Sequence, residues 1–134
     1  VLSGDTLVAV VEVKTQVGSF GNNFNNRVEE ALGNATDFWA AYREGLYKPS
    51  QRPWLGYLFM LEESETSIRP TKPILLKPYP VDESFQKRSY AQRYELVCER
   101  LVRDRLYDAA CFFTSNIRAG KRGEYQEPNP EFEH

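Results

Sequence analysis

Apolar residues follow one another without interruption over residues 7–11, near the start of the chain. This run predicts a strand over about residues 6–13 that is covered on both faces, as in the centre of an α/β sheet. The residues before it, Ser3, Gly4 and Asp5, favour a tight turn. The start of the chain is therefore predicted to be a β-hairpin.

A second pattern has the period of an amphipathic helix. Six residues share its apolar face: Val28, Ala31, Leu32, Ala35, Trp39 and Tyr42. The spacing predicts a helix that Asn25 or Asn26 caps and Gly45 ends. Residues 18–27, which contain two glycines and four asparagines, are predicted to be a loop.

The rest of the chain predicts a second buried strand at residues 54–63 and a proline-rich loop at residues 63–88. A helix is predicted at about residues 85–105 and a third buried strand at residues 108–115. A short edge strand is expected within the loop, at residues 74–76. The element order predicts an α/β fold with a mixed sheet flanked by helices, formed as a single domain over residues 1–134.

Composition restricts the chemistry. The only histidine, His134, is the last residue, so catalysis by an internal histidine is excluded. Two cysteines are too few for a four-cysteine zinc site or a disulfide framework. Any bound metal is therefore expected to be held by oxygen atoms.

The location and partners of the protein are also limited by its composition. No apolar run approaches the roughly 20 residues of a membrane-spanning helix, and no signal peptide opens the chain. The protein is therefore expected to be cytoplasmic, without a membrane partner. The net charge of −2 creates no general basic field, so binding of nucleic acid would depend on local contacts.

Candidate chemistry lies where the first strand ends. Alternation along a strand places Glu12, Lys14 and Gln16 on one side. A carboxylate at such a position can bind Mg²⁺, and a nearby lysine can hold a water molecule or a phosphoryl oxygen. The alternative interpretation is a solvated strand end, where charged residues are common.

Metal-assisted cleavage of a phosphodiester needs a second carboxylate beside Glu12. Asp5 is the only earlier acid, and seven residues of strand separate the two by about 23 Å. A two-residue turn at residues 4–5 would pair Glu12 with a position three or four residues before Val1. Because the chain also begins with Val1 rather than methionine, the second acid is expected upstream, in a domain truncated at its N-terminus.

The segment LVAVVEVKTQ resembles the second half of the PD-(D/E)XK nuclease motif. Three further segments look like the XhoI family of type II restriction endonucleases: FGNNFNNRVEEALGNATDFWAAYREG, RPWLGYLFMLEE and RLVRDRLYDAACFF. The similarity extends from Leu7 to about Phe113. It implies a restriction-endonuclease-like core with the fold of PD-(D/E)XK nucleases.

The resemblance further implies a bacterial, Mg²⁺-dependent enzyme of a restriction-modification system. Such an enzyme cuts double-stranded DNA at a palindromic site, CTCGAG in this family, and acts as a homodimer. Glu12 would bind the metal, Lys14 would orient the attacking water and stabilise the pentacovalent phosphate, and Gln16 would support the site. The aspartate of the motif is absent from the chain.

Other polar residues have both a functional and an ordinary interpretation. Glu29 and Glu30 open the predicted helix; either acid could support the metal, with Glu30 the candidate ligand, or favour the helix dipole. Candidate DNA contacts are Asn22, Asn23, Asn25, Asn26, Arg27, Lys121 and Arg122. Asparagines also populate turns and caps, and basic loop residues are often only solvated.

Three interpretations therefore stay open at the level of sequence. The first is a sequence-specific nuclease. The second is a catalytically defective remnant that still binds DNA. The third is an unrelated α/β interaction domain on which Glu12 and Lys14 are solvated surface residues without a catalytic role.

Overall fold

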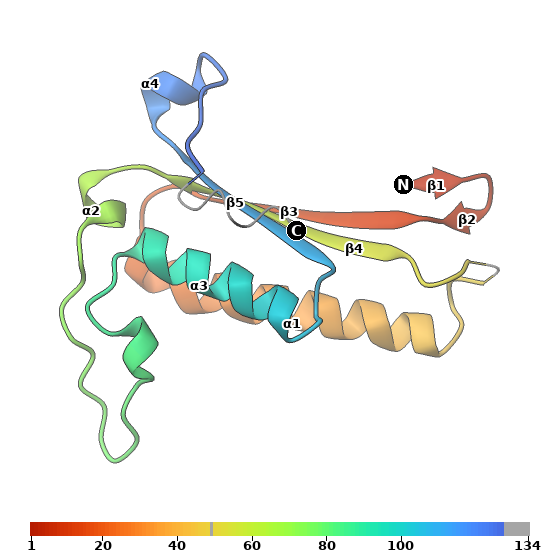
Figure 1. The fold of residues 1–134 in the computed structure, drawn as a ribbon, viewed down its shortest axis with the longest axis horizontal. Coiled ribbons are helices and arrows are strands. Elements are labelled where there is room, and N and C mark those ends of the chain that lie inside the picture. Colours follow the sequence, from red (N-terminus) through yellow and green to blue (C-terminus); the bar gives the residue numbers. More distant parts are fainter. Residues whose placement is uncertain (49, 128–134) are drawn as a thin grey trace.

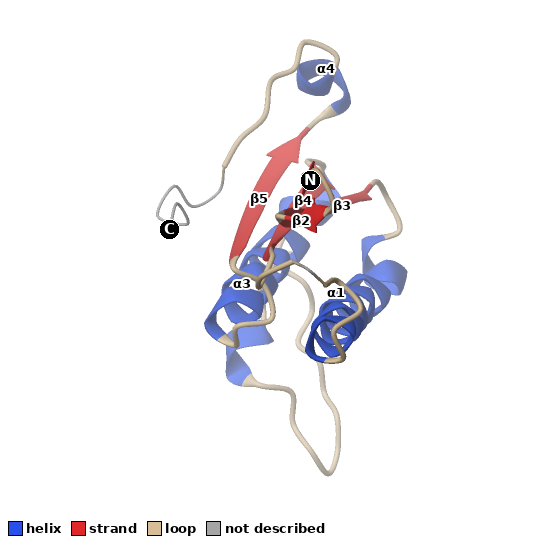
Figure 2. Ribbon diagram, turned by 90° about the vertical axis from the view of Figure 1, so that its right-hand side faces the viewer, coloured by secondary structure: helices blue, strands red, loops and turns tan. Residues whose placement is uncertain are grey.

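Two layers form the structure, a three-stranded sheet and a pair of helices (Figure 1). The computed structural model describes residues 1–48 and 50–127, so His134 lies outside the described residues. All strands of this sheet are parallel and lie in the order β3 (Ala9–Gln16), β4 (Trp54–Glu62) and β5 (Ala109–Ser115). Figure 2 shows α1 (Phe20–Arg43) and α3 (Tyr90–Arg103) on the same face of the sheet. The predicted α/β class is confirmed.

The predicted hairpin is present as β1 (Leu2–Ser3) and β2 (Thr6–Leu7), which pair antiparallel. Its ladder continues onto β3, where the amino group of Val1 donates to the Ala9 carbonyl at 2.6 Å. The Val1 carbonyl accepts from the amides of Val8 and Ala9, at 3.0 and 3.4 Å. Two amides on one carbonyl form a β-bulge, which divides the predicted strand in two at Val8. This antiparallel hairpin forms a two-stranded sheet of its own, whereas the three-stranded sheet of the described residues is entirely parallel.

The expectation that the first long strand is covered on both faces is wrong for the described part of the chain. Val11 is 48% exposed and Val13 is 60% exposed. Both helices pack on the opposite face, toward which Glu12 and Lys14 point. The apolar run therefore supplies one partly buried face and one uncovered face.

The asparagine-rich segment is helical, so its prediction as a loop capped at Asn25 or Asn26 is also wrong. Helix α1 begins at Phe20, after Ser19 in a left-handed conformation. Phe20 is buried, and the Phe24 ring meets the Tyr94 ring with centroids 4.9 Å apart. These two aromatic residues extend the apolar stripe at helical spacing, and their burial outweighs the weak helix propensity of asparagine.

The connection from β4 to β5 contains α2 (Glu65–Ile68) and η1 (Glu83–Phe85) before α3. Helix α3 begins at Tyr90 rather than near residue 85, because Ser89 and Gln92 form a capping box there. The edge strand expected at residues 74–76 does not form. Instead, the amide and carbonyl of Ile74 bind the side chain of Gln86, each at 3.0 Å.

The core lies between the sheet and the two helices. Phe59 of β4 stacks on Tyr94 of α3 with ring centroids 4.3 Å apart, and on Phe112 of β5 at 6.0 Å. The short helix α4 (Ile117–Gly120) follows β5. Among the residues that the structure describes, no helix has the length and apolarity needed to cross a membrane.

Candidate functional site

Glu12 and Lys14 lie next to each other on the helix-facing side of β3. The Lys14 Nζ atom is 3.4 Å from Glu12 Oε1, and the two side chains are 25% and 13% exposed. Partial burial strengthens this ion pair relative to one in open water, while the remaining exposure leaves both groups accessible. The predicted placement of both residues on one face is confirmed.

Two neutral donors fix the Glu12 carboxylate. Asn34 of α1 donates from Nδ2 to Oε1 at 2.8 Å, and the hydroxyl of Tyr107 donates to Oε2 at 2.5 Å. Tyr107 is 1% exposed, and burial together with the bond to Glu12 raises its pKa well above the ordinary value. The hydroxyl therefore stays protonated near neutral pH and can donate to the carboxylate.

Glu30 joins the cluster from α1. Its Oε2 atom is 3.5 Å from Lys14 Nζ and 2.6 Å from Arg27 Nη1. Because α1 begins at Phe20, Glu29 and Glu30 belong to its third turn, and an interaction with the helix N-terminus does not explain them. Glu29 is exposed and has no ion-pair partner in the described part of the chain.

The cluster has charges of alternating sign in the order Arg27, Glu30, Lys14 and Glu12. Carboxylate and amide oxygens are ligands that Mg²⁺ accepts, so Glu12 and Glu30 have suitable donor chemistry. Within residues 1–48 and 50–127, however, no group of three or more acidic, histidine or cysteine side chains could hold a metal ion. The described residues therefore bring two carboxylates, Glu12 and Glu30, to either side of the Lys14 ammonium.

Gln16 lies two residues beyond Lys14 on the same face of β3, and it is buried. Its amide donates to the Gly18 carbonyl at 2.5 Å. The amide of Gly18 in turn donates to Glu62 of β4 at 3.0 Å. Gln16 thus holds the turn between β3 and α1, and among the described residues it forms no hydrogen bond to Glu12 or Lys14.

The candidate DNA contacts do not form a single surface. Asn22, Asn25 and Asn26 are exposed on the first two turns of α1, and Asn23 is partly buried there. Lys121 and Arg122 follow α4, which Figures 1 and 2 show on the other side of the sheet from α1. Arg122 is also paired with Glu124 at 2.7 Å.

Sequence reasoning missed Asn34 and Tyr107. Asn34 lies four residues after Glu30, so helical spacing places both on the side of α1 that faces Glu12. That periodicity could have identified Asn34. Tyr107 is 95 positions from Glu12, and no local pattern relates the two.

Comparisons with known proteins agree on one family. The model described as "Restriction endonuclease XhoI" matches residues 1–127. The chain is 49% identical over 123 residues to the type II restriction enzyme BstVI of Geobacillus stearothermophilus, a match that covers 91% of this chain and 54% of that enzyme. It is 44% identical over 106 residues to the type II restriction enzyme XhoI of Xanthomonas vasicola, covering 76% and 41%.

A third relative, the type II restriction enzyme AbrI of Azospirillum brasilense, is 54% identical over 68 residues, which are 50% of this chain and 31% of that enzyme. The chain therefore spans about half, or less, of the length of these curated relatives. No solved structure matches the chain.

Proposed function

Because the chain belongs to the XhoI family of restriction endonucleases, we propose that it carries part of the active site of a Mg²⁺-dependent nuclease that cuts double-stranded DNA. The observation that carries the proposal is the pair formed by Glu12 and Lys14, with Nζ 3.4 Å from Oε1. A carboxylate and an ammonium held this close can serve a metal ion and a phosphoryl oxygen at the same position.

Each side chain has a defined part in the proposed reaction. Glu12 would hold the metal, oriented by Asn34 and Tyr107, and Glu30 is a candidate further ligand. When bound, Mg²⁺ would lower the pKa of a water molecule and offset charge on the phosphate. Lys14, whose ammonium lies between two carboxylates, would orient the attacking water and stabilise the pentacovalent phosphate.

The second acid is proposed from the hairpin register. Val1 pairs with Ala9 on the β3 side of the bulge. In an antiparallel ladder, each residue further along β3 pairs with one residue earlier on the partner strand. Glu12, three residues after Ala9, therefore pairs with the third position before Val1. The sequence-based expectation was a position three or four residues upstream. We expect an aspartate there in the intact protein, within reach of the carboxylate of Glu12.

A palindromic target, CTCGAG or a close variant, and a homodimer complete the proposal. Two copies related by a two-fold axis present identical sites to the two halves of a palindrome. Gln16 would support the site by fixing the turn after β3. At least one of Asn22, Asn23, Asn25 and Asn26 is proposed to contact a base edge. Arg27 would bind guanine or phosphate, and Lys121 and Arg122 would bind phosphate.

A second candidate is a defective remnant that binds DNA without cutting it. This alternative applies if the intact protein adds no further acid to Glu12 and Glu30, the two carboxylates that flank Lys14 among the described residues. The two candidates agree on binding and differ only in cleavage.

Incubation of the intact protein with two plasmids, one with a single CTCGAG site and one with that site scrambled, separates the candidates. The nuclease proposal predicts a linear product from the first plasmid alone, with Mg²⁺ and not with EDTA. Glu12→Gln should abolish the product, whereas Asp37→Asn, on the exposed side of α1, should leave it unchanged. Retarded but uncut plasmid under all conditions would instead support the remnant.

A further inference from the structure

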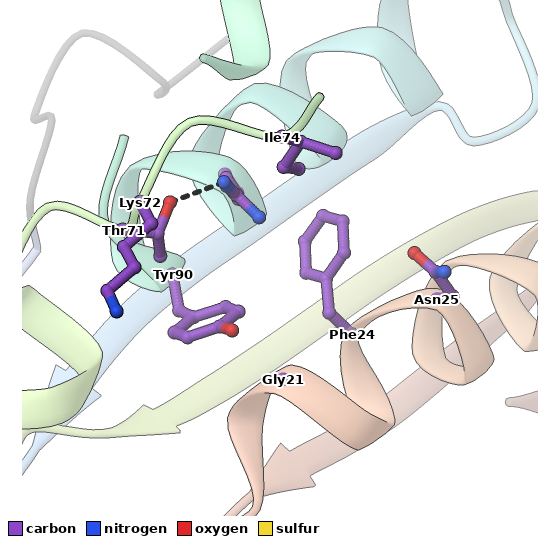
Figure 3. A pocket seen from close by; sticks show the side chains of 8 residues that line it. Gly21, Phe24, Asn25, Thr71, Lys72, Ile74 and Tyr90 are labelled. Carbon is purple, nitrogen blue, oxygen red and sulfur yellow. Dashed lines mark hydrogen bonds between the residues drawn. The ribbon is translucent and has the colours of Figure 1, made fainter. Parts of the chain in front are cut away.

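A pocket of about 340 Å³ opens between the start of α1, the start of α3 and the loop that precedes η1. Figure 3 shows the rings of Phe24 and Tyr90 bordering this space from the two helices, with Thr71, Lys72 and Ile74 on the loop side. Arg93 completes the wall. We call it the Arg93 pocket.

Arg93 is a buried cation that lacks an anionic partner. The residue is 6% exposed, and its Nη2 atom donates to the Thr71 hydroxyl at 2.5 Å. Its guanidinium carbon lies 5.6 Å from the centroid of the Tyr90 ring. The Nε atom is buried without a hydrogen-bond partner, and no carboxylate of the described residues forms an ion pair with the guanidinium. A buried charge in this condition is costly unless a ligand neutralises it.

The chemistry of the wall selects an anion. Lys72 adds a second positive charge, and none of the residues that line the pocket is acidic. The guanidinium of Arg93 and the amide of Asn25 are hydrogen-bond donors, whereas the Thr71 hydroxyl already donates to the Arg88 carbonyl at 2.9 Å. Such a combination of cations and neutral donors is the usual one for phosphate oxygens.

The position of the pocket relates it to the site at Glu12. Gly21 lines the pocket and Glu30 contacts Lys14, and these two residues are nine positions apart on α1. At about 100° per residue they lie about 180° apart around the helix, so the pocket and the site flank α1 on opposite sides. The exposed residues Asn22 and Asn26 lie, like Gly21 and Glu30, in the N-terminal half of α1.

The dimensions of a DNA duplex fit this arrangement. A helix with its side chains is about 10–12 Å across, close to the roughly 12 Å width of the major groove. A duplex that receives the first half of α1 in its major groove has a phosphate strand on each side of the helix. One strand then lies toward Glu12 and Lys14, and the other toward the Arg93 pocket.

We propose that the Arg93 pocket binds a phosphate group of the DNA backbone on the strand opposite the one that approaches Glu12. The inference rests on the proposed function, since it needs a DNA substrate. It assigns Arg93 and Lys72 to positioning of the duplex, without a part in base recognition.

The test measures the affinity of the intact protein for a short CTCGAG duplex and for a scrambled duplex, in EDTA, across a series of salt concentrations. Arg93→Gln is expected to weaken binding of both duplexes about tenfold, and Lys72→Gln should weaken both as well. Each substitution should lower the slope of log Kd against log salt by about 0.9, the effect of one phosphate contact. Lys77→Gln, an exposed lysine of the same loop outside the pocket, is the charge-matched control and should change neither quantity.

Unchanged affinity and slope in Lys72→Gln and in a folded Arg93→Gln protein would overturn the inference; if Arg93→Gln does not fold, Lys72→Gln decides. A parallel arm titrates inorganic phosphate and follows the melting temperature. Stabilisation by phosphate that Lys72→Gln removes, with unchanged DNA affinity, would assign the pocket to free phosphate and overturn the DNA assignment. Wild-type protein that binds neither duplex would refute the proposed function itself.

Discussion

At the scale of single residues, the orientation of Glu12 is the central feature of the site. Alternation along the strand was sufficient to predict that Glu12 and Lys14 share a face. The two donors that fix the carboxylate come from separate elements, Asn34 from α1 and Tyr107 from the turn before β5. A contact across 95 positions depends on the packing of the whole fold, so sequence pattern alone could not predict it.

Removal of the Tyr107 hydroxyl tests this orientation. Tyr107→Phe leaves the Glu12 carboxylate without its 2.5 Å donor, and we expect the apparent affinity for Mg²⁺ in the cleavage reaction to fall about tenfold. The measurement is the cleavage rate as a function of Mg²⁺ concentration, at saturating DNA.

Tyr94→Phe is the matched control, because the buried Tyr94 hydroxyl has no hydrogen-bond partner among the residues that the structure describes. Its half-saturating Mg²⁺ concentration should equal that of the wild type. A Tyr107→Phe enzyme with an unchanged Mg²⁺ requirement would show that the hydroxyl serves only the stability of the fold.

Asp82 provides a pH-dependent prediction at the same scale. Hydrogen bonds from Ser84, and then from Arg100, lower its pKa from 3.8 to about 2. A carboxyl with a depressed pKa in the folded state stabilises that state above its ordinary pKa and loses this effect as the pH falls toward 2. Asp82→Asn should therefore be less stable than the wild type at pH 5, with the difference shrinking between pH 4 and pH 2.

Urea unfolding at each pH measures that difference. Asp37→Asn, at an exposed acid that forms no hydrogen bond or ion pair with any other described residue, should give no such trend. A constant difference between wild type and Asp82→Asn across this range would contradict the proposed role of ionised Asp82.

At the scale of elements, α1 differs most from its sequence-based prediction. The second half followed from the apolar stripe, and its end at Gly45 is confirmed by the structure. The sequence predicts a loop for its first half, because four asparagines dominate the local propensity there. Packing of Phe20 and Phe24 against α3 and the core is a tertiary effect that overrides this propensity.

Alanine substitutions at Gly33, within α1, and at Gly45, just beyond its end, are predicted to change stability in opposite directions. Gly45 has a φ of +77°, and the amides of Gly45 and Leu46 donate to the carbonyls of Tyr42 and Ala41 in a Schellman motif. Gly45→Ala should cost about 1 kcal/mol, because a Cβ atom is unfavourable in the left-handed conformation. A Cβ at Gly33, within α1, would meet no atom within 4 Å, so Gly33→Ala should stabilise by about 0.5–1 kcal/mol. Urea unfolding checks both, and equal effects of the two substitutions would contradict the assigned helix end.

At the scale of the whole molecule, the order of elements was predictable and the coverage of the sheet was not. Alternating strands and helices predicted the α/β fold, and right-handed parallel connections account for the two helices on one face. The sequence predicts that Val11 and Val13 lie in a strand covered on both faces, but both are exposed. Apolar residues alone do not specify which face of a strand a helix covers. The same layering places α4, which Lys121 and Arg122 follow, on the other side of the sheet from α1, a separation that no local pattern could indicate.

Single-turnover cleavage of a CTCGAG duplex by Lys14→Met protein tests the central claim most directly. The Lys14 ammonium lies between the carboxylates of Glu12 and Glu30. If it stabilises the phosphate during cleavage, the intact protein with Lys14→Met should cut at least about 10²-fold more slowly than the wild type. Its affinity for the duplex in EDTA should change much less, and Lys77→Met should cut at the wild-type rate. A Lys14→Met protein that cuts at the wild-type rate would contradict the assignment of the active site to Glu12 and Lys14.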